Sequence, residues 1–260
     1  MSHFSKSGPA PTRRTLLRTT AAGAALTTVG LAGSTAAHAT SPVRPGPRIG
    51  ILLYDGFSVL DATGPAEVLS RLPGAEVTMV AQRRGPVRTD TGDLRVMAER
   101  SIADVDRFDV LLVPGAGARG TTSTIANRSL LEWIRKVHRH TRWTTSVCTG
   151  SLVLAAAGLL EGRKATTYWA SAPYLESVYG VTYVPERYVR SGKIITAAGV
   201  SAGLDMALQL SALMAGDTTA QALQLALEYD PQPPFDSGNA AEAEPWLKEL
   251  ALQLLAQSQV

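Results

Sequence analysis

The feature that most constrains the fold is an alternation of short apolar runs with helical segments. Four runs have this character: RIGILLY (48–54), AEVTMVA (75–81), DVLLVPG (109–115) and TTSVC (144–148). A strand that is buried on both faces of a parallel sheet reads as a continuous apolar run. Strands that alternate with helices favour a parallel sheet covered on both sides. The pattern therefore predicts one α/β domain.

The segments between and after these runs read as helices, with one late hairpin. In residues 127–142, Leu130, Leu131, Ile134 and Val137 recur at the spacing of one helical face. Residues 188–199 (YVRSGKIITAAG) predict a strand pair turned at Ser191-Gly192. The further expected elements are a helix near 65–72, apolar helices at 201–215 and 218–228, a Pro-rich loop near 231–239, and an amphipathic helix at 244–255.

The first 39 residues are interpreted as an export signal. Paired Arg13 and Arg14 precede a mildly apolar run at 21–32, and Ala37-His38-Ala39 offers a small-x-small cleavage pattern. That order is typical of a secretory leader, and the arginine pair indicates the twin-arginine route. The run is shorter than the roughly 20 residues of a spanning helix, so no stable membrane anchor is expected. The predicted mature protein is periplasmic or secreted.

Removing this leader changes the charge. The whole chain has a formal charge of +3, and the leader carries four basic residues and no acid, so residues 40–260 carry −1. Without a basic surplus, a nucleic-acid partner is not expected. We therefore divide the chain into a signal peptide (1–39), a Pro-rich linker (40–47) and one α/β domain (48–260).

Cys148 is the only cysteine of the chain, which excludes an internal disulfide. It ends the run TTSV and begins the apolar segment TGSLVLAAAGLL. A thiol at a helix N-terminus can have its pKa lowered by the exposed N–H groups. Cys148-Thr149-Gly150 resembles a nucleophile elbow, with Gly150 allowing a close backbone approach. A free cysteine is also a common core residue, and the residue types alone leave both interpretations open.

Gly115, Gly117 and Gly120 spell the G-x-G-x-x-G pattern of dinucleotide sites. The pattern follows a late strand, a Thr/Ser-rich segment is expected to delay the helix, and no suitably placed acid follows. We therefore interpret the stretch as a tight loop near Cys148. The backbone amides of Gly115 and Ala116 would form an oxyanion cradle there.

Asp61 lies in YDGFSVLDATGPAEVL, just before the expected helix start at Pro65. A capping or turn role is the ordinary interpretation of such an aspartate. The alternative is a general acid/base that faces Cys148 across the strand ends. Asp55, before Gly56, and Asp205, inside an expected helix, fit that role less well.

Histidine offers no partner for the thiol. In residues 40–260, only His138 and His140 occur, near the end of one expected helix. Residues two apart do not share a helical face, so they make a poor metal pair, and a solvated helix end is expected. We predict no metal site and no cofactor, and a carboxylate must then handle the protons if Cys148 is catalytic.

Taken together, these stretches resemble the ThiJ/PfpI superfamily, and within it the isonitrile hydratase branch. The resemblance runs from about Arg48 to Gly238 and rests on LDATGPAEVL, VPGAGA, SVCTGSLVLAAAGLLEGRKATTYWAS, AGVSAGLDMAL and LEYDPQPPFDSG. It implies a single-domain, three-layer α/β/α sandwich with a mostly parallel sheet, flavodoxin-like and class I glutamine-amidotransferase-like. It also implies a homodimer.

The resemblance assigns roles to three residues. Cys148 corresponds to the nucleophile of the elbow, Asp61 to the aspartate of the L-D-x-T-G-P segment, and Thr149 to the threonine after the cysteine. The implied reaction adds water to an isonitrile through a thioimidate on Cys148, with Asp61 as general acid/base, giving an N-substituted formamide. The implied partner is therefore a small isonitrile.

One departure concerns the substrate pocket. The chain reads Thr166-Thr167-Tyr168-Trp169 where the hydratases have histidine at the third position. Tyr168, with Trp169 beside it, is therefore expected to line the pocket and tune substrate preference.

Three alternative functions remain open. An amidase, peptidase-like or glyoxalase-like enzyme would use the same Cys148. A ligand-binding domain of a transcription regulator would need a C-terminal helix-turn-helix, for which too few residues follow Gly238, and export would separate it from DNA. A thiol stress sensor would use an exposed cysteine of low pKa.

Overall fold

The computed structural model describes residues 45–259. The predicted signal peptide (1–39) and the first part of the predicted linker lie outside the described residues, and export therefore stays a prediction. Among residues 45–259, no helix combines the length and apolar character that crossing a bilayer requires.

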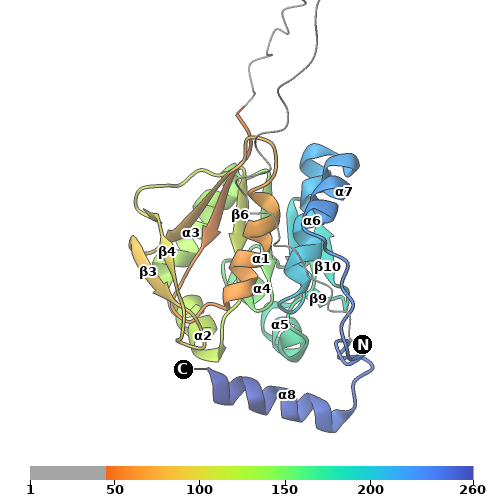
Figure 1. Ribbon diagram of the computed structural model, residues 1–260. Helices are drawn as coiled ribbons and strands as arrows, with labels where there is room; N and C mark the ends of the chain where they lie inside the picture. Colours follow the sequence, from red (N-terminus) through yellow and green to blue (C-terminus); the bar gives the residue numbers. More distant parts are fainter. Residues whose placement is uncertain (1–44, 260) are drawn as a thin grey trace, which may run out of the picture. The chain divides into compact units, whose positions relative to one another are not determined.

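The described chain forms one domain around a seven-stranded sheet with the order β10-β11-β7-β6-β1-β2-β5 (Figure 1). Neighbouring strands run parallel except β10, which pairs antiparallel with β11. The four apolar runs are confirmed as strands, as is the late hairpin. The strands of this sheet are β1 (Arg48–Leu52), β2 (Glu76–Ala81), β5 (Arg100–Ser101), β6 (Val110–Val113), β7 (Trp143–Val147), β10 (Tyr188–Ser191) and β11 (Ile194–Ala197).

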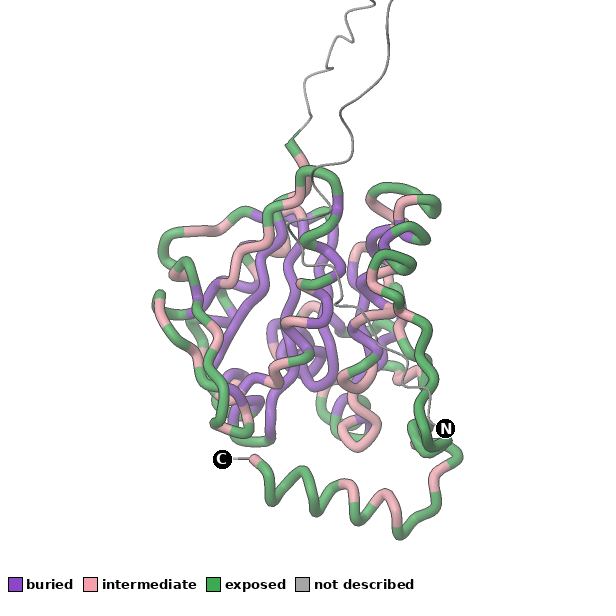
Figure 2. Tube along the Cα trace, in the orientation of Figure 1, coloured by how far each residue is buried: buried purple, intermediate pink, exposed green. Residues whose placement is uncertain are grey.

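Helices cover both faces of the sheet, which confirms the three-layer sandwich (Figure 1). One layer contains α1 (Val59–Leu69), α6 (Ala202–Ala215) and α7 (Asp217–Ala226). The other contains α2 (Ala118–Ala126), α3 (Arg128–His140), α4 (Gly150–Ala156) and α5 (Ala172–Tyr179). β6 and β7 are buried along their whole length and β1 from Ile49 onward, and the predicted apolar face of α3 packs into the core (Figure 2).

Several small elements carry no clear sequence pattern. They are the hairpin of β3 (Gly85–Arg88) and β4 (Arg95–Ala98), the short pair of β8 (Lys164–Ala165) and β9 (Thr182–Tyr183), and the 3-10 turn η1 (Trp169–Ser171). The β3–β4 hairpin has exposed and half-buried residues in alternation, and its polar positions read as a loop. α5 is likewise absent from the prediction.

Two helix boundaries differ from the prediction. α1 begins at Val59, so Pro65 lies inside the helix instead of starting it. A proline at that position lacks the N–H that would bond to the carbonyl of Asp61, four residues earlier. α2 begins at Ala118, directly after the loop that contains Gly115 and Gly117, which we call the glycine loop. The Thr/Ser-rich segment forms this helix instead of delaying it.

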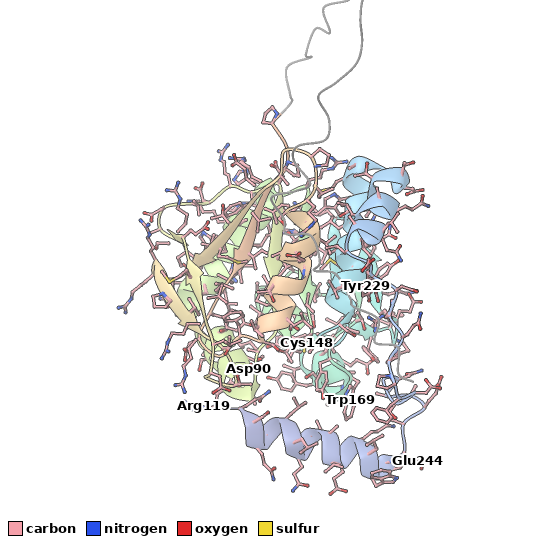
Figure 3. All side chains as sticks on the ribbon, viewed as in Figure 1. Asp90, Arg119, Cys148, Trp169, Tyr229 and Glu244 are labelled. Carbon is pink, nitrogen blue, oxygen red and sulfur yellow. The ribbon has the colours of Figure 1, made fainter. Side chains whose placement is uncertain are left out.

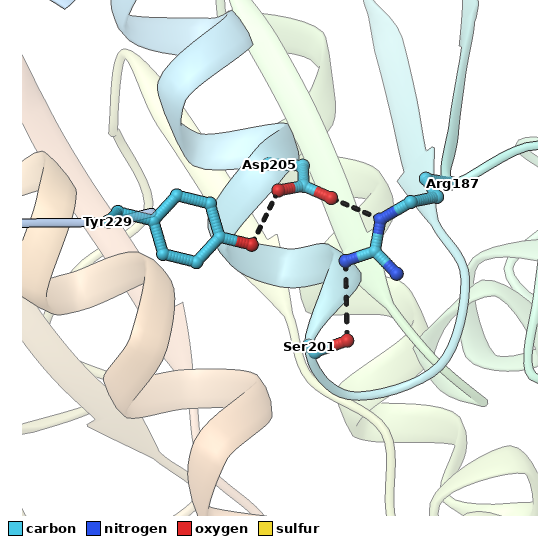
Figure 4. A network of polar contacts seen from close by, with 4 residues as sticks. All are labelled: Arg187, Ser201, Asp205 and Tyr229. Atoms are coloured by element: carbon cyan, nitrogen blue, oxygen red, sulfur yellow. Dashed lines mark hydrogen bonds and ion pairs between the residues drawn. The ribbon is translucent and has the colours of Figure 1, made fainter. Parts of the chain in front are cut away.

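The last segment is anchored before it reaches α8 (Pro245–Ser258). The Tyr229 hydroxyl donates to Asp205 Oδ1 at 2.7 Å (Figure 4). Asp205 also pairs with Arg187, whose guanidinium reaches the Ser201 hydroxyl at 3.2 Å. This network connects the start of the Pro-rich segment to α6. Its contacts give Asp205 a structural role.

Candidate functional site

The site is formed by three loops at the carboxyl ends of neighbouring parallel strands. The loops follow β1, β6 and β7, and β6 lies between the other two strands. β1 is also the point where the strand order reverses, because β2 lies on one side of it and β6 on the other. Open α/β sheets bind ligands at such a switch point.

Cys148 occupies a strained turn between β7 and α4. Its φ is +55°, a left-handed conformation that a side chain with a Cβ rarely adopts. Its amide donates to the Ala198 carbonyl at 2.9 Å, and the Thr167 hydroxyl donates to its carbonyl at 3.2 Å. A Cβ on Gly150 would lie 2.2 Å from the Val113 carbonyl oxygen, so glycine is required two residues on. The predicted nucleophile elbow is confirmed as a conformation.

Asp61 lies in the first turn of α1 and is fully buried. Its carboxylate Oδ2 accepts the Gly115 amide at 2.9 Å. Its Oδ1 is buried and has no hydrogen-bond partner among residues 45–259. An unpartnered carboxyl oxygen in such a place is costly, and this one is available to a proton, a water molecule or a substrate atom.

Gly115 allows Asp61 and Cys148 to face each other. A Cβ at this position would lie 2.7 Å from Asp61 Oδ2, 2.8 Å from the Cys148 Cβ and 2.8 Å from the Thr149 nitrogen. The Asp61 carboxylate and the Cys148 Cβ therefore both lie next to the position that a Cβ at residue 115 would occupy, so the two residues are neighbours. The structure therefore brings together the two residues that the sequence singled out from separate loops.

Burial dominates the electrostatics of this pair. It raises the pKa of Asp61 to about 7, and Asp90 adds to the rise while the Gly115 amide opposes it. Burial also raises the pKa of the Cys148 thiol, and the nearby Asp61 adds in the same direction. The prediction that the helix N-terminus lowers the thiol pKa is therefore wrong, since desolvation outweighs the amides of Thr149 and Val200. Both shifts favour the neutral forms, so burial favours a protonated thiol beside a carboxyl group that can exchange a proton near neutral pH.

The backbone amides of Gly115 and Ala116 do not have the role that the sequence predicted. The Gly115 amide bonds to Asp61, and the Ala116 amide donates to Thr149 Oγ1 at 2.9 Å. Thr121 completes this connection, with its hydroxyl 3.0 Å from that of Thr149. Because site side chains already satisfy both amides, the predicted oxyanion cradle is not formed. The loop positions Asp61 and Thr149 instead.

A cavity of about 610 Å³ opens beside the elbow. Its lining includes Ala116, Thr149 and Tyr168, whereas Cys148 and Asp61 are not among the lining residues. Trp169 does not line it but packs against Tyr168 with ring centroids 5.4 Å apart. Figure 3 shows Cys148 between Asp90 and Arg119 on one side and Trp169 on the other. Cys148 itself is only 7% exposed, so access to the thiol is narrow.

Sequence reasoning missed several supporting residues. Tyr54 is buried near the pair and donates to the Pro114 carbonyl at 2.5 Å, and Thr167 supports the elbow. Asp90 lines the cavity and raises the pKa of Asp61. Thr121 lies in the segment that the sequence presented as a polar loop. Only Thr167, inside a family-like stretch, had a signal that could have identified it.

His138 lies away from the site and is not simply solvated. Its Nδ1 is 2.8 Å from the Thr144 hydroxyl, near the start of β7, whereas Cys148 follows the end of that strand. Four residues of strand separate the two, roughly 13 Å at 3.3 Å per residue. Half-burial, with Lys193 and Arg163 nearby, lowers the pKa of His138 to about 4. Within residues 45–259, no group of three His, Cys, Asp or Glu side chains could hold a metal ion.

The chain is similar to proteins that share this arrangement of elements. It is 43% identical over 192 residues to an isonitrile hydratase of Pseudomonas putida, which covers 74% of this chain and 82% of that protein. A crystal structure of a ThiJ/PfpI family protein from Pseudomonas syringae superposes with a TM-score of 0.77 at 33% identity, covering 88% of this chain and 93% of that one.

A second kind of relative combines this domain with further sequence. A helix-turn-helix transcriptional regulator of Pseudomonas aeruginosa is 32% identical over 167 residues, which cover 62% of this chain and 48% of the regulator. The model of the DJ-1/PfpI family matches residues 47–213, the segment that contains Asp61, the glycine loop and the elbow. This chain therefore belongs to the DJ-1/PfpI family.

Proposed function

We propose that this protein hydrates isonitriles to N-substituted formamides, with Cys148 as nucleophile and Asp61 as general acid/base. The observation that carries the proposal is the buried pair of a thiol on a strained elbow and a carboxyl group whose pKa is raised to about 7. A group that titrates near neutral pH is suited to both giving and taking a proton. The similarity to an isonitrile hydratase supports the same chemistry.

The first step forms a covalent adduct. The Cys148 sulfur bonds to the terminal carbon of the isonitrile, the thiol proton passes to the Asp61 carboxylate, and Asp61 delivers it to the same carbon. The product is a thioimidate on Cys148, and Asp61 is again ionised. The raised pKa of the thiol is compatible with this step, because the pair needs to keep one transferable proton.

The second step releases the product. Asp61 removes a proton from water as the oxygen bonds to the thioimidate carbon, and that proton passes to the substrate nitrogen. The carbon–sulfur bond then breaks, the hydroxyl proton returns to sulfur through Asp61, and a formamide leaves. In this proposal the Thr149 hydroxyl, which lines the cavity, orients the water. The sum of the two steps is the addition of one water molecule.

The narrow access to Cys148 supports an isonitrile over larger electrophiles. Cys148 is only 7% exposed, and its neighbour in the chain, Thr149, lines the cavity. The isonitrile group is linear and ends in its reactive carbon, so it needs less space beside a buried thiol than a peptide bond does. Burial and the raised thiol pKa also argue against a thiol sensor, which needs an exposed thiolate.

Mass spectrometry of protein quenched during turnover tests the proposal. With n-butyl isonitrile, the parent should show a mass increase equal to one whole isonitrile, and N-butylformamide should accumulate. Cys148→Ser should give neither product. Formamide production by Cys148→Ser at the parent rate, or no turnover by the parent, would overturn the mechanism.

A further inference from the structure

The C-terminal helix α8 contributes to the candidate site. Leu252, Leu255 and Ala256 of α8 line the cavity together with the C-cap residue Gln259, and the spacing of three and four residues places the first three on one face of the helix. α8 runs beside the carboxyl edge of the sheet near α2 and α5 (Figure 1). Although this helix lies far from Cys148 in the sequence, one of its faces belongs to the pocket.

A second contact places the end of α8 against the glycine loop. A Cβ on Gly117 would lie 2.7 Å from Oε1 and 2.8 Å from Cδ of the Gln259 side chain. Gly117 has an ordinary φ of −57°, so its backbone does not require glycine. The absent side chain instead leaves room for Gln259. The last turn of α8 is thus fitted to the loop that positions Thr149.

Much of the cavity lining is apolar. It includes Leu252 and Leu255 of α8 and, from the body of the domain, Tyr168, Tyr174, Ile125 and Leu152, with Asp90 and Arg119 as the charged members. Leu252 and Leu255 are 41% and 40% exposed, a large fraction for leucines that line a pocket. An apolar ligand would cover the part of these leucine side chains that faces the cavity, and that burial is favourable.

The size of the cavity exceeds what a small isonitrile needs. Its volume of about 610 Å³ lies within the range of pockets that hold drug-sized ligands, about 300–1,000 Å³. In the proposed reaction, the reacting carbon lies near Thr149, the neighbour of Cys148. The remaining, largely apolar space has room for a large substituent on the isonitrile nitrogen.

We propose that Leu252 and Leu255 of α8 determine specificity by binding a bulky apolar N-substituent of the substrate. The proposal rests on the proposed hydration reaction and narrows its substrate class to isonitriles with cyclic or branched hydrocarbon groups. Leu252 and Leu255 take no part in the chemical step.

Relative rates with cyclohexyl and methyl isonitrile test the specificity. Leu252→Ser and Leu255→Ser should each lower the cyclohexyl-to-methyl ratio of kcat/KM by about 10-fold, within the range of hydrophobic pocket contacts. Leu254→Ser is the matched control, because Leu254 lies on the same helix, is 57% exposed and does not line the cavity. Its ratio should equal that of the parent. An unchanged ratio in both pocket variants would overturn the proposal.

Alkylation of Cys148 separates this proposal from the hydration reaction. Because the chain has one cysteine, the rates with N-cyclohexylmaleimide and N-ethylmaleimide report on this thiol alone. The cyclohexyl-to-ethyl ratio should fall about 10-fold in Leu252→Ser and Leu255→Ser and stay constant in Leu254→Ser. If the parent hydrates no isonitrile but this pattern holds, the proposed reaction is wrong, and the proposed role of Leu252 and Leu255 is confirmed. If hydration occurs and neither ratio depends on Leu252 or Leu255, their proposed role is wrong.

Discussion

Burial of one carboxyl group beside one thiol gives this site its character. Asp61 lies in a helix that lacks one internal hydrogen bond because of Pro65, and its carboxylate accepts the Gly115 amide. The protein therefore holds an acid that is neither paired with a cation nor solvated. Its raised pKa follows from desolvation, and the adjacent thiol is held as a proton donor by the same cause.

Asp61→Asn should lower turnover of isonitriles on the order of 10²–10⁴-fold, the usual range for a positioned acid/base. The amide retains the hydrogen bond from Gly115 but cannot exchange the proton. In the parent, kcat/KM should rise as the pH rises through about 7, because the carboxylate must accept the thiol proton. Steady-state rates from pH 5 to 9 measure both effects.

The control for this variant is the reaction of Cys148 with iodoacetamide, which should persist in Asp61→Asn. Hydration within a few-fold of the parent rate, or an unchanged rise near pH 7, would show that Asp61 is not the proton carrier. Asp61 would then be only a structural residue of α1.

The loop between β6 and α2 organises the site at the level of elements. This loop follows β6 and connects the segments that follow β1 and β7. The Gly115 amide donates to Asp61 of α1, and the Ala116 amide donates to Thr149 before α4. Phe57 adds backbone bridges to Ala116 and to Thr89. A change in this loop therefore alters the geometry of the pair without touching either of its members.

Gly115→Ala should abolish most of the activity, because its Cβ would come within 2.8 Å of Asp61 and Cys148 atoms. Gly64→Ala is the matched control, since its Cβ would make only ordinary contacts, the nearest at 3.4 Å to Leu60. Kinetic assays and thermal melts of both variants measure the effect. Full activity in Gly115→Ala would show that catalysis does not depend on the close approach of Asp61 and Cys148 at this glycine.

At the scale of the whole molecule, the two ends of the sheet respond to pH in opposite ways. At the carboxyl end, the folded pKa of Asp61 is about 7, above its ordinary value of 3.8, so its contribution to stability is lost as the pH rises through 7. At the amino end, the folded pKa of His138 is about 4, below its ordinary value of 6.5. Its contribution is lost as the pH falls from 6.5 through 4.

Two variants should therefore tilt the pH dependence of stability in opposite directions. The free energy of unfolding of Asp61→Asn should rise relative to that of the parent as the pH increases from 4 to 8, by an amount on the order of 2–4 kcal/mol. His138→Asn should gain stability relative to the parent as the pH falls from 6.5 to 4, because no half-buried imidazole must then be charged. Urea unfolding at pH 4.5, 6 and 8 measures both differences. A parallel shift at all three values would contradict the assigned pKa directions.

The fold was readable from the sequence because local patterns encode it. Strands buried on both faces require continuous apolar runs, and 48–54, 75–81, 109–115 and 144–148 all became strands of the central sheet. The elbow at Cys148 was equally local, since a strand, a cysteine and Gly150 follow one another directly. The resemblance to a family added Asp61 and Thr149 as site residues. The strand, the cysteine and the turn glycine were thus readable from adjacent positions in the sequence.

Tertiary structure alone decided the electrostatics, the use of the loop amides and the extent of the pocket. The direction of the Cys148 pKa depends on how completely the fold removes water, and burial outweighed the helix N-terminus that the sequence displays. The amides of Gly115 and Ala116 were taken by Asp61 and Thr149, which only three-dimensional proximity could reveal. The return of α8 to the cavity depends on a long Pro-rich connection whose path has no local signal. Contacts between residues far apart in the chain are physical consequences of packing, and no short pattern carries them.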